Sequence, residues 1–130
     1  MPRIEHVAIW TTDLERLKTF YETAFGASAG KKYVNPRKGF ESTFVTFASG
    51  ARLELMQVPA LRAASDDARG PVAGYAHIAL SLDSEDDVDA LTARLRAEGH
   101  PVLDGPRRTG DGYYESAVCD PDGNRIEITV

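Results

Sequence analysis

The chain has 130 residues, 42% of them hydrophobic and 27% charged, so it is long enough to form one compact globular unit. A formal net charge of −5 argues against a general nucleic-acid-binding surface. No apolar run approaches the roughly 18 residues that cross a membrane, and the first ten residues lack the layout of a signal peptide. We therefore expect a cytoplasmic protein that does not bind membranes.

The first half of the chain reads as one strand, one helix and three further strands. The strand is EHVAIW at 5–10. The helix that follows is predicted to begin with a capping box of Thr12 and Glu15, and to end at Gly26, which suits a left-handed C-terminal position. Leucines and aromatic residues recur along it at helical spacing. The three strands are expected at 28–34, 41–48 and 51–58.

The second half repeats this order. AHIALS at 76–81 resembles EHVAIW, and RIEI at 125–128 resembles RLEL at 52–55. Between them, a helix is predicted to begin at Ser84 with Asp87 and to end at Gly99. The remaining strands are expected at 102–108, 113–119 and 124–130, with DPDGN as the last turn.

The repeat predicts an α+β protein in which a βαβββ module occurs twice. We place both modules in a single domain, with a linker between them that is rich in Ala, Pro and Gly. The predicted bounds are 1–58 for module one, 59–74 for the linker and 75–130 for module two, within one domain of 1–130.

The repeat also places a histidine and a glutamate at equivalent positions of each module: His6 with Glu54, and His77 with Glu127. Strand side chains alternate between two faces, and the aliphatic residues of these strands must cover the helices. The four polar residues are therefore expected on the opposite face. Each alone has an ordinary explanation as a solvated glutamate or a packed histidine. Together, two imidazoles and two carboxylates are typical of a divalent-metal site.

Large apolar side chains share that face, which a simply solvated face would not explain. We expect instead a curved mixed sheet that encloses a metal-binding cleft, with the helices on its outer face. Cationic and aromatic residues in GPRRTGDGYYE at 105–115 either bind an anionic part of a substrate or are solvated loop residues, and we favour the second. The candidate substrate-binding residues are Trp10, Phe44, Met56, Arg107 and Tyr113.

Three segments, DLERLKTFYETAFG, GYAHIALSLD and, most specifically, DPDGNRIEI, resemble the vicinal oxygen chelate superfamily. This superfamily includes glyoxalase I, bleomycin-resistance proteins, methylmalonyl-CoA epimerases and extradiol dioxygenases. The resemblance covers essentially the whole chain and is greatest to small bacterial glyoxalase-like proteins. In glyoxalase I the metal is held by a His on strand one, a Glu on strand four, a His on strand five and a Glu on strand eight. The matching residues here are His6, Glu54, His77 and Glu127.

The resemblance implies Zn²⁺ or Ni²⁺ as cofactor and a lyase or isomerase reaction on a small 2-oxo compound or its thiol adduct, through a metal-stabilised enediolate. One glutamate would be the catalytic base, and Glu54 and Glu127 are both candidates. Trp10 and Val58 occupy the places of an Arg and an Asn that help hold glutathione in bacterial glyoxalase I, which puts glutathione dependence in question.

The superfamily also implies an assembly and several alternative functions. Relatives often pair two chains, so we expect a homodimer with the cleft at or near the interface, although one chain can also close its own site. Epimerisation and ring cleavage by a dioxygenase are other reactions of the same scaffold. A non-catalytic protein that binds an aromatic drug or metabolite is the alternative from another class, and Trp10, Phe44, Tyr113 and Tyr114 would suit it.

Overall fold

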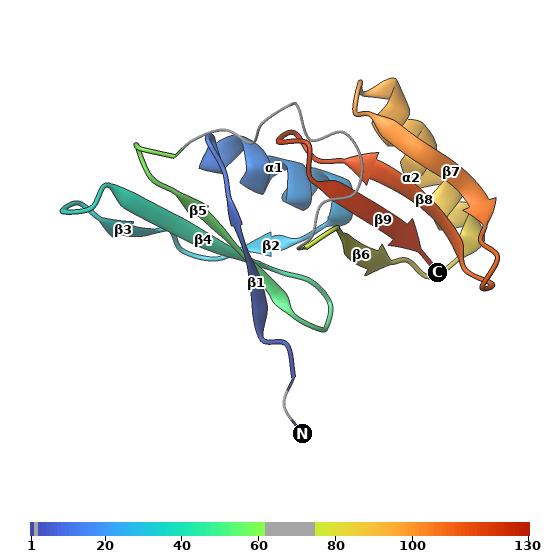
Figure 1. Cartoon of the computed structure of the whole chain (residues 1–130), viewed down its shortest axis with the longest axis horizontal. Coiled ribbons are helices and arrows are strands. Elements are labelled where there is room, and N and C mark those ends of the chain that lie inside the picture. The colour runs from blue at the N-terminus through green and yellow to red at the C-terminus, as the bar shows by residue number, and fades with distance from the viewer. Residues whose placement is uncertain (2, 62–74) are drawn as a thin grey trace. The chain divides into compact units, whose positions relative to one another are not determined.

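The computed structural model describes residue 1, residues 3–61 and residues 75–130 (Figure 1). The chain divides into two compact units, Met1–Ser65 and Asp66–Val130. The order of helices and strands confirms the predicted α+β class with two βαβββ modules. Most of the predicted linker lies outside the described residues. No helix in the described part of the chain is long and apolar enough to cross a membrane.

Module one has a five-stranded sheet in the order β1-β5-β4-β2, with β3 also paired to β4. β1 and β5 are parallel, and the other pairs are antiparallel. Its elements are β1 (His6–Trp10), α1 (Leu14–Phe25), β2 (Ser28–Ala29), β3 (Tyr33–Asn35), β4 (Phe40–Thr46) and β5 (Arg52–Gln57).

The strand predicted at 28–34 is divided into β2 and β3 in the structure. Ala29 is the register partner of Val45, whereas Tyr33 is the partner of Ser42. The three residues at 30–32 therefore oppose only two residues of β4. An extra residue on one strand interrupts the ladder, and this explains why one predicted strand became two.

Module two has a four-stranded sheet in the order β6-β9-β8-β7, again with the first and last strands of the module parallel. The register shifts along the β7–β8 pair. Gly105 lies at this irregularity with φ +73°, and a Cβ there would lie 2.6 Å from the backbone oxygen of Glu115. Only glycine fits this position. The elements are β6 (Ile78–Ser81), α2 (Glu85–Ala97), β7 (Val102–Arg108), β8 (Tyr114–Cys119) and β9 (Arg125–Thr129).

The two helices begin differently from each other. Ser84 caps α2 as predicted, since its Oγ accepts a hydrogen bond from the backbone N of Asp87 at 3.1 Å. The predicted Thr12 cap of α1 is wrong: Asp13 is the cap, and its Oδ1 accepts from the backbone N of Arg16 at 3.0 Å. The reason lies in β5, where the side chain of Gln57 accepts from the backbone N of Leu14 at 2.8 Å. This contact stabilises a helix that begins at Leu14.

Each helix covers one face of the sheet of its own module (Figure 1). The side chains that meet between helix and sheet are the aliphatic ones that the alternation predicted, and Leu55 and Ile128 are fully buried. Burying a side chain of this size contributes about 1.5–3 kcal/mol. The other face of each sheet carries His6 and Glu54 in module one, and His77 and Glu127 in module two.

Candidate functional site

The two modules have the same strand register at the candidate ligands. In the parallel β1–β5 pair, Ala8 is the partner of Glu54. In the parallel β6–β9 pair, Ala79 is the partner of Glu127. In both modules the histidine lies two residues before that alanine, which puts its side chain on the same face as the glutamate. The sequence repeat is therefore also a repeat in space within each module.

This register brings the side chains of each pair together. The Nε2 atom of His6 lies 3.7 Å from Oε1 of Glu54, and Nε2 of His77 lies 3.2 Å from Oε2 of Glu127. The glutamate side chains are 19% and 18% exposed, so the two carboxylates have nearly the same burial. The His–Glu pairs of the two modules therefore have glutamates that are buried to the same extent.

The chemistry of these donors fits a divalent metal. Each module offers one imidazole nitrogen and one carboxylate oxygen, and Zn²⁺ and Ni²⁺ both accept such ligands. Among the described residues, no three His, Cys, Asp or Glu side chains gather into a metal-binding group. Each module therefore offers one histidine and one glutamate as candidate donors.

In module one, a carboxylate lies on the far side of the His6 ring. Oε2 of Glu5 is 2.5 Å from Nδ1 of His6, and Oε1 of Glu5 accepts from Nε of Arg52 at 2.8 Å. The hydrogen bond from His6 and the contact with Arg52 hold the pKa of Glu5 below its usual value. The guanidinium of Arg52 lies over the ring of Phe44, and His6 meets the same ring edge to face. Phe44 therefore packs against both His6 and Arg52.

In module two, the surroundings of the glutamate differ. Nη2 of Arg125 lies 3.4 Å from Oε1 of Glu127. Burial and the neighbouring Glu127 raise the pKa of Glu115, a β8 residue that the sequence reasoning missed. The alternation along β8 could have identified Glu115 from the sequence. It puts Glu115 on the same face as Ala117, which is the register partner of Glu127. A second carboxylate therefore lies close to Glu127.

The predicted substrate-binding cation Arg107 also lies on this side of module two. It is the register partner of Glu115, and its Nε donates to Asp104 at 2.7 Å. The ion pair with Asp104 raises the pKa of Arg107, and the charges of Glu115 and Glu127 act in the same direction. Arg107 is thus close enough to Glu115 and Glu127 for their negative charges to act on it.

An aromatic group lies at the other end of β1. Trp10, 49% exposed, contacts Phe40 edge to face with ring centroids 6.3 Å apart, and Phe40 contacts Tyr33 at 6.1 Å. Met56 is the register partner of Trp10. Trp10 and Met56 are among the predicted substrate-binding residues, whereas Phe40 and Tyr33 are not. The structure joins the three aromatic rings into one partly exposed surface.

Lys32, which lies between β2 and β3, forms ion pairs with two carboxylates. Lys32 lies 3.1 Å from Oε1 of Glu15 and 3.3 Å from Oε2 of Glu41. These contacts raise the pKa of Lys32 and lower that of Glu15, to which Lys18 also contributes. Lys32 therefore joins α1 to β4 by charge.

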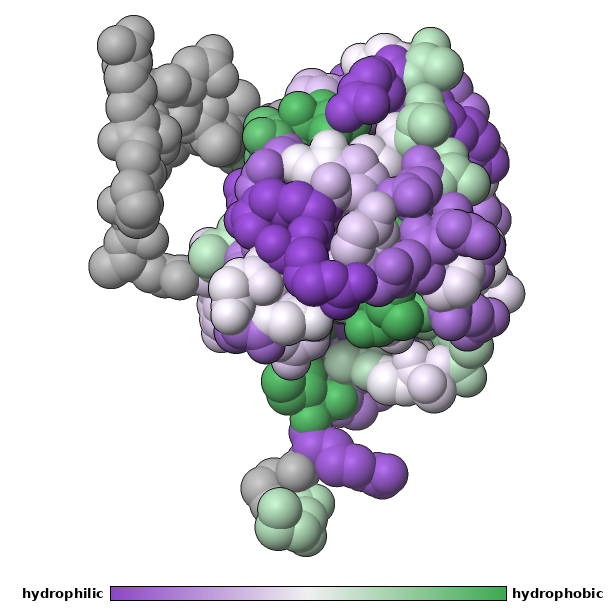
Figure 2. All heavy atoms as spheres, turned by 90° about the vertical axis from the view of Figure 1, so that its right-hand side faces the viewer, coloured by the Kyte–Doolittle hydropathy of each residue, from purple (hydrophilic) through white to green (hydrophobic). Residues whose placement is uncertain are grey.

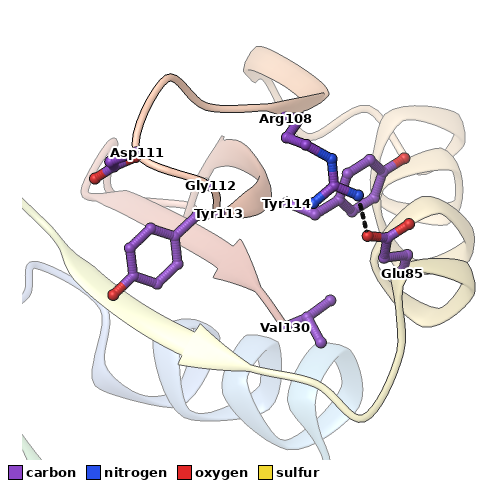
Figure 3. A pocket seen from close by; sticks show the side chains of 7 residues that line it. All are labelled: Glu85, Arg108, Asp111, Gly112, Tyr113, Tyr114 and Val130. Atoms are coloured by element: carbon purple, nitrogen blue, oxygen red, sulfur yellow. Dashed lines mark hydrogen bonds and ion pairs between the residues drawn. The ribbon is translucent and has the colours of Figure 1, made fainter.

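A pocket of about 430 Å³ lies at one end of module two (Figure 3). Arg108 there pairs with Glu85, and the hydroxyl of Tyr114 donates to Asp89 of α2. The predicted substrate-binding residue Tyr113 lies in this pocket, whose lining includes none of His77, Arg107 and Glu127. The structure thus separates Tyr113 from the other predicted residues of module two. The lining consists of Glu85, Arg108, Asp111, Gly112, Tyr113, Tyr114 and Val130.

The surface seen in Figure 2 is dominated by hydrophilic side chains, and the hydrophobic ones form small separate areas. This agrees with the exposure of Arg108 and Glu85, whose side chains are 58% and 50% exposed. The lining of the pocket therefore includes two exposed charged side chains, Arg108 and Glu85.

Both the sequence and the fold of the chain are similar to those of known proteins. A sequence model of the Glyoxalase/Bleomycin resistance protein/Dioxygenase superfamily matches residues 3–128. No curated protein matches the chain.

Among solved structures, the trypanothione-dependent glyoxalase I of Leishmania major is 26% identical, with a TM-score of 0.78 over 99% of this chain and 86% of that one. Lactoylglutathione lyase from Agrobacterium tumefaciens is 26% identical, with a TM-score of 0.68 over 97% and 91% of the two chains. Glyoxalase I from Zea mays, at 21% identity and a TM-score of 0.80, shares the fold, and this chain covers 44% of its length.

Proposed function

Because the chain belongs to the Glyoxalase/Bleomycin resistance protein/Dioxygenase superfamily, we propose that it is a divalent-metal-dependent lyase or isomerase of the glyoxalase type. Its substrate is a small 2-oxo compound or the thiol adduct of one. The observation that carries this proposal is the His–Glu pair that recurs in the same register in both modules. Two glyoxalase structures that are 26% identical over nearly the whole chain support it.

The proposed metal ligands are His6, Glu54, His77 and Glu127, with Zn²⁺ or Ni²⁺ as the metal. A bound metal of this kind supplies a Lewis acid that stabilises negative charge developing on adjacent substrate oxygens. We further propose that the protein is a homodimer with its cleft at or near the interface.

The chain's own residues move the proton and orient the substrate. One of Glu54 and Glu127 takes the C–H proton, which requires a carboxylate oxygen at about 3 Å from it. Nη2 of Arg125 lies 3.4 Å from the carboxylate of Glu127. The equivalent arginine of module one, Arg52, forms an ion pair with Glu5 instead. Arg107 binds an anionic group of the substrate, because a guanidinium offers paired donors to a carboxylate.

Apolar parts of the substrate pack against Trp10 and Met56, beside Phe44 and the ring of Phe40. Tyr113 contributes from its own pocket only if the substrate or a thiol extends that far. The same aromatic surface favours a second candidate function, which is binding of an aromatic drug or metabolite without catalysis. The half exposure of Trp10 is the observation that supports it. Epimerase and dioxygenase reactions are further alternatives on the same proposed ligands.

Metal content of the purified protein is the first test. We expect bound Zn²⁺ or Ni²⁺ in the wild type, and a large loss in Glu127→Gln and in Glu54→Gln. Glu22→Gln, which makes the same change on α1, should keep the wild-type content. A protein that holds no metal and takes up neither ion would contradict the enzyme proposals and favour the binding protein.

Activity is the second test. The loaded protein should convert methylglyoxal in the presence of a thiol, and several thiols should be compared because glutathione dependence is in question. A metal-loaded protein without turnover on any of them would contradict the lyase proposal, and epimerase and dioxygenase substrates would then be the next to assay.

A further inference from the structure

We propose that Glu5 is a positioning residue for His6: it holds the ring proton on Nδ1 and so presents Nε2 as the metal-binding atom. This inference rests on the proposed metal-binding function and concerns a residue outside the four proposed ligands. It also makes the His–Glu pairs of the two modules differ, because the position in module two that is equivalent to Glu5 is Ala76.

The hydrogen bond between Glu5 and His6 has a defined direction. Oε2 of Glu5 lies 2.5 Å from Nδ1 of His6. An ionised carboxylate can only accept, so Nδ1 must carry the hydrogen. A neutral imidazole then has its lone pair on Nε2, which is the atom that faces Glu54. Metal-binding histidines commonly donate their other N–H to a carboxylate, which orients the ring and raises its basicity.

The side chain of Glu5 is itself held in place by Arg52 as well as by His6. Its side chain is 62% exposed, so a single contact would compete with water. Both oxygens, however, have partners: Oε2 contacts His6, and Oε1 contacts Nε and Nη2 of Arg52 at 2.8 and 2.5 Å. The backbone N of Arg52 also donates to the backbone oxygen of Glu5 at 2.9 Å. Glu5 precedes β1, so its side chain is not bound to the alternation of that strand.

Phe44 contacts both Arg52 and His6, and so connects the two partners of Glu5. The guanidinium carbon of Arg52 lies 3.9 Å from the centroid of the Phe44 ring, and the His6 and Phe44 ring centroids are 5.4 Å apart at 90°. Glu5, Arg52, Phe44 and His6 therefore form a closed ring of contacts. Each member restricts the others, and the orientation of the imidazole is set before a metal arrives.

The surroundings of His77 in module two differ from those of His6. The residue before His77 is Ala76, which has no carboxylate. Oε2 of Glu127 lies 3.2 Å from Nε2 of the His77 ring. A carboxylate at this distance favours a proton on Nε2. Without metal, the two histidines are thus expected in opposite tautomers, and His77 must give up its Nε2 proton before it binds.

Nitrogen-15 spectra of the imidazoles test the tautomers in the metal-free protein, at a pH above about 8, where an ordinary imidazole is neutral. The wild type should show the proton of His6 on Nδ1 and that of His77 on Nε2. Glu5→Ala should shift His6 toward the opposite tautomer and leave His77 unchanged. Glu22→Ala removes the same charge from α1 and should change neither. A wild-type His6 protonated on Nε2 overturns the proposal, even if the Glu5→Ala protein does not fold.

Zinc affinity, measured by competition with a chelating dye, tests the consequence. Glu5→Ala should bind Zn²⁺ about 10- to 100-fold more weakly than the wild type, and Glu22→Ala should bind it equally well. Unchanged affinity in Glu5→Ala, with a wild type that binds zinc, overturns the positioning role and leaves the metal site standing. A wild type that binds neither zinc nor nickel contradicts the proposed function, whatever the tautomer of His6.

Discussion

The guanidinium carbon of Arg52 lies 3.9 Å from the centre of the Phe44 ring, on the same face of module one as His6. A cation above an aromatic ring is worth about 0.5–1 kcal/mol at exposed sites. Phe44→Ala removes this contact and the packing of His6. We expect a loss of about 2 kcal/mol in the free energy of unfolding, below the ~3–5 kcal/mol of a fully buried phenylalanine. Phe44→Leu keeps most of the volume and should lose less. Urea unfolding measures both, and an unchanged Phe44→Ala would contradict the packing role.

The start of α1 gives a matched pair of variants. Asp13→Ala removes the side chain that accepts from the backbone N of Arg16 and should cost about 1 kcal/mol. Thr12→Ala should be close to neutral, because Thr12 is exposed and only its backbone oxygen is used, by Gln57. The midpoint of urea unfolding distinguishes the two. Equal losses would mean that the capping box predicted from the sequence also contributes.

The ion pair between Lys32 and Glu15 predicts a pH dependence. Its hydrogen bond lowers the pKa of Glu15 in the folded protein. The stabilisation is therefore present above the ordinary glutamate pKa and is lost as pH falls through the lowered one. Lys32→Met should raise the pKa of Glu15 toward its ordinary value, as carboxyl NMR titration can measure, although Lys18 keeps part of the effect. Lys31→Met, its exposed neighbour, is the control. An unmoved Glu15 pKa in Lys32→Met would refute the assignment.

The helix-facing side of β9 carries the packing of module two. Ile128 is fully buried, and Ile128→Ala should destabilise the protein by about 2–5 kcal/mol through lost burial and a cavity. Ile4→Ala is the matched control, because Ile4 is 73% exposed, and it should change the unfolding free energy by less than about 0.5 kcal/mol. Thermal unfolding by calorimetry compares the two. A small loss at Ile128 would contradict the packing described for α2.

Metal binding should also raise the free energy of unfolding of the protein. At a free metal concentration of 100 times Kd, Zn²⁺ should raise the free energy of unfolding by about 2.7 kcal/mol, and a chelator should reverse the gain. His77→Ala should largely abolish this gain. His100→Ala, at the third histidine of the chain, should preserve it. Differential scanning fluorimetry with and without metal provides the measurement, and an equal gain in His77→Ala would exclude His77 as a ligand.

Local patterns in the sequence predicted much of this protein. The repeat of EHVAIW and AHIALS, with RLEL and RIEI, predicted the two modules, and strand alternation predicted the face of His6, Glu54, His77 and Glu127. The turn DPDGN was also predictable, because Gly123 needs a positive φ, and it has 85° in the structure. Alternation and turn chemistry depend on neighbouring residues alone, so they can be read without the fold.

Contacts between distant segments could not be predicted in this way. The division of 28–34 into two strands depends on how many residues of β4 lie opposite, and the start of α1 depends on Gln57, 43 residues away from Leu14. Glu115 was missed because its neighbour Glu127 belongs to another strand. Arg107 and Tyr113 are close in sequence but have different neighbours, because Arg107 lies on β7 opposite Glu115, whereas Tyr113 precedes β8 and lines the pocket with Glu85 and Arg108.

Residue order alone thus established two modules, their exposed and covered strand faces, and one histidine and one glutamate on the exposed face of each. The folded chain decided which atoms of these residues meet. Glu5 contacts His6 because it lies outside β1, and Arg52, 47 residues away, holds it there. Such contacts depend on strand register, which is set by hydrogen bonds and packing between segments far apart in the sequence. Local periodicity carries no information about which segment lies opposite.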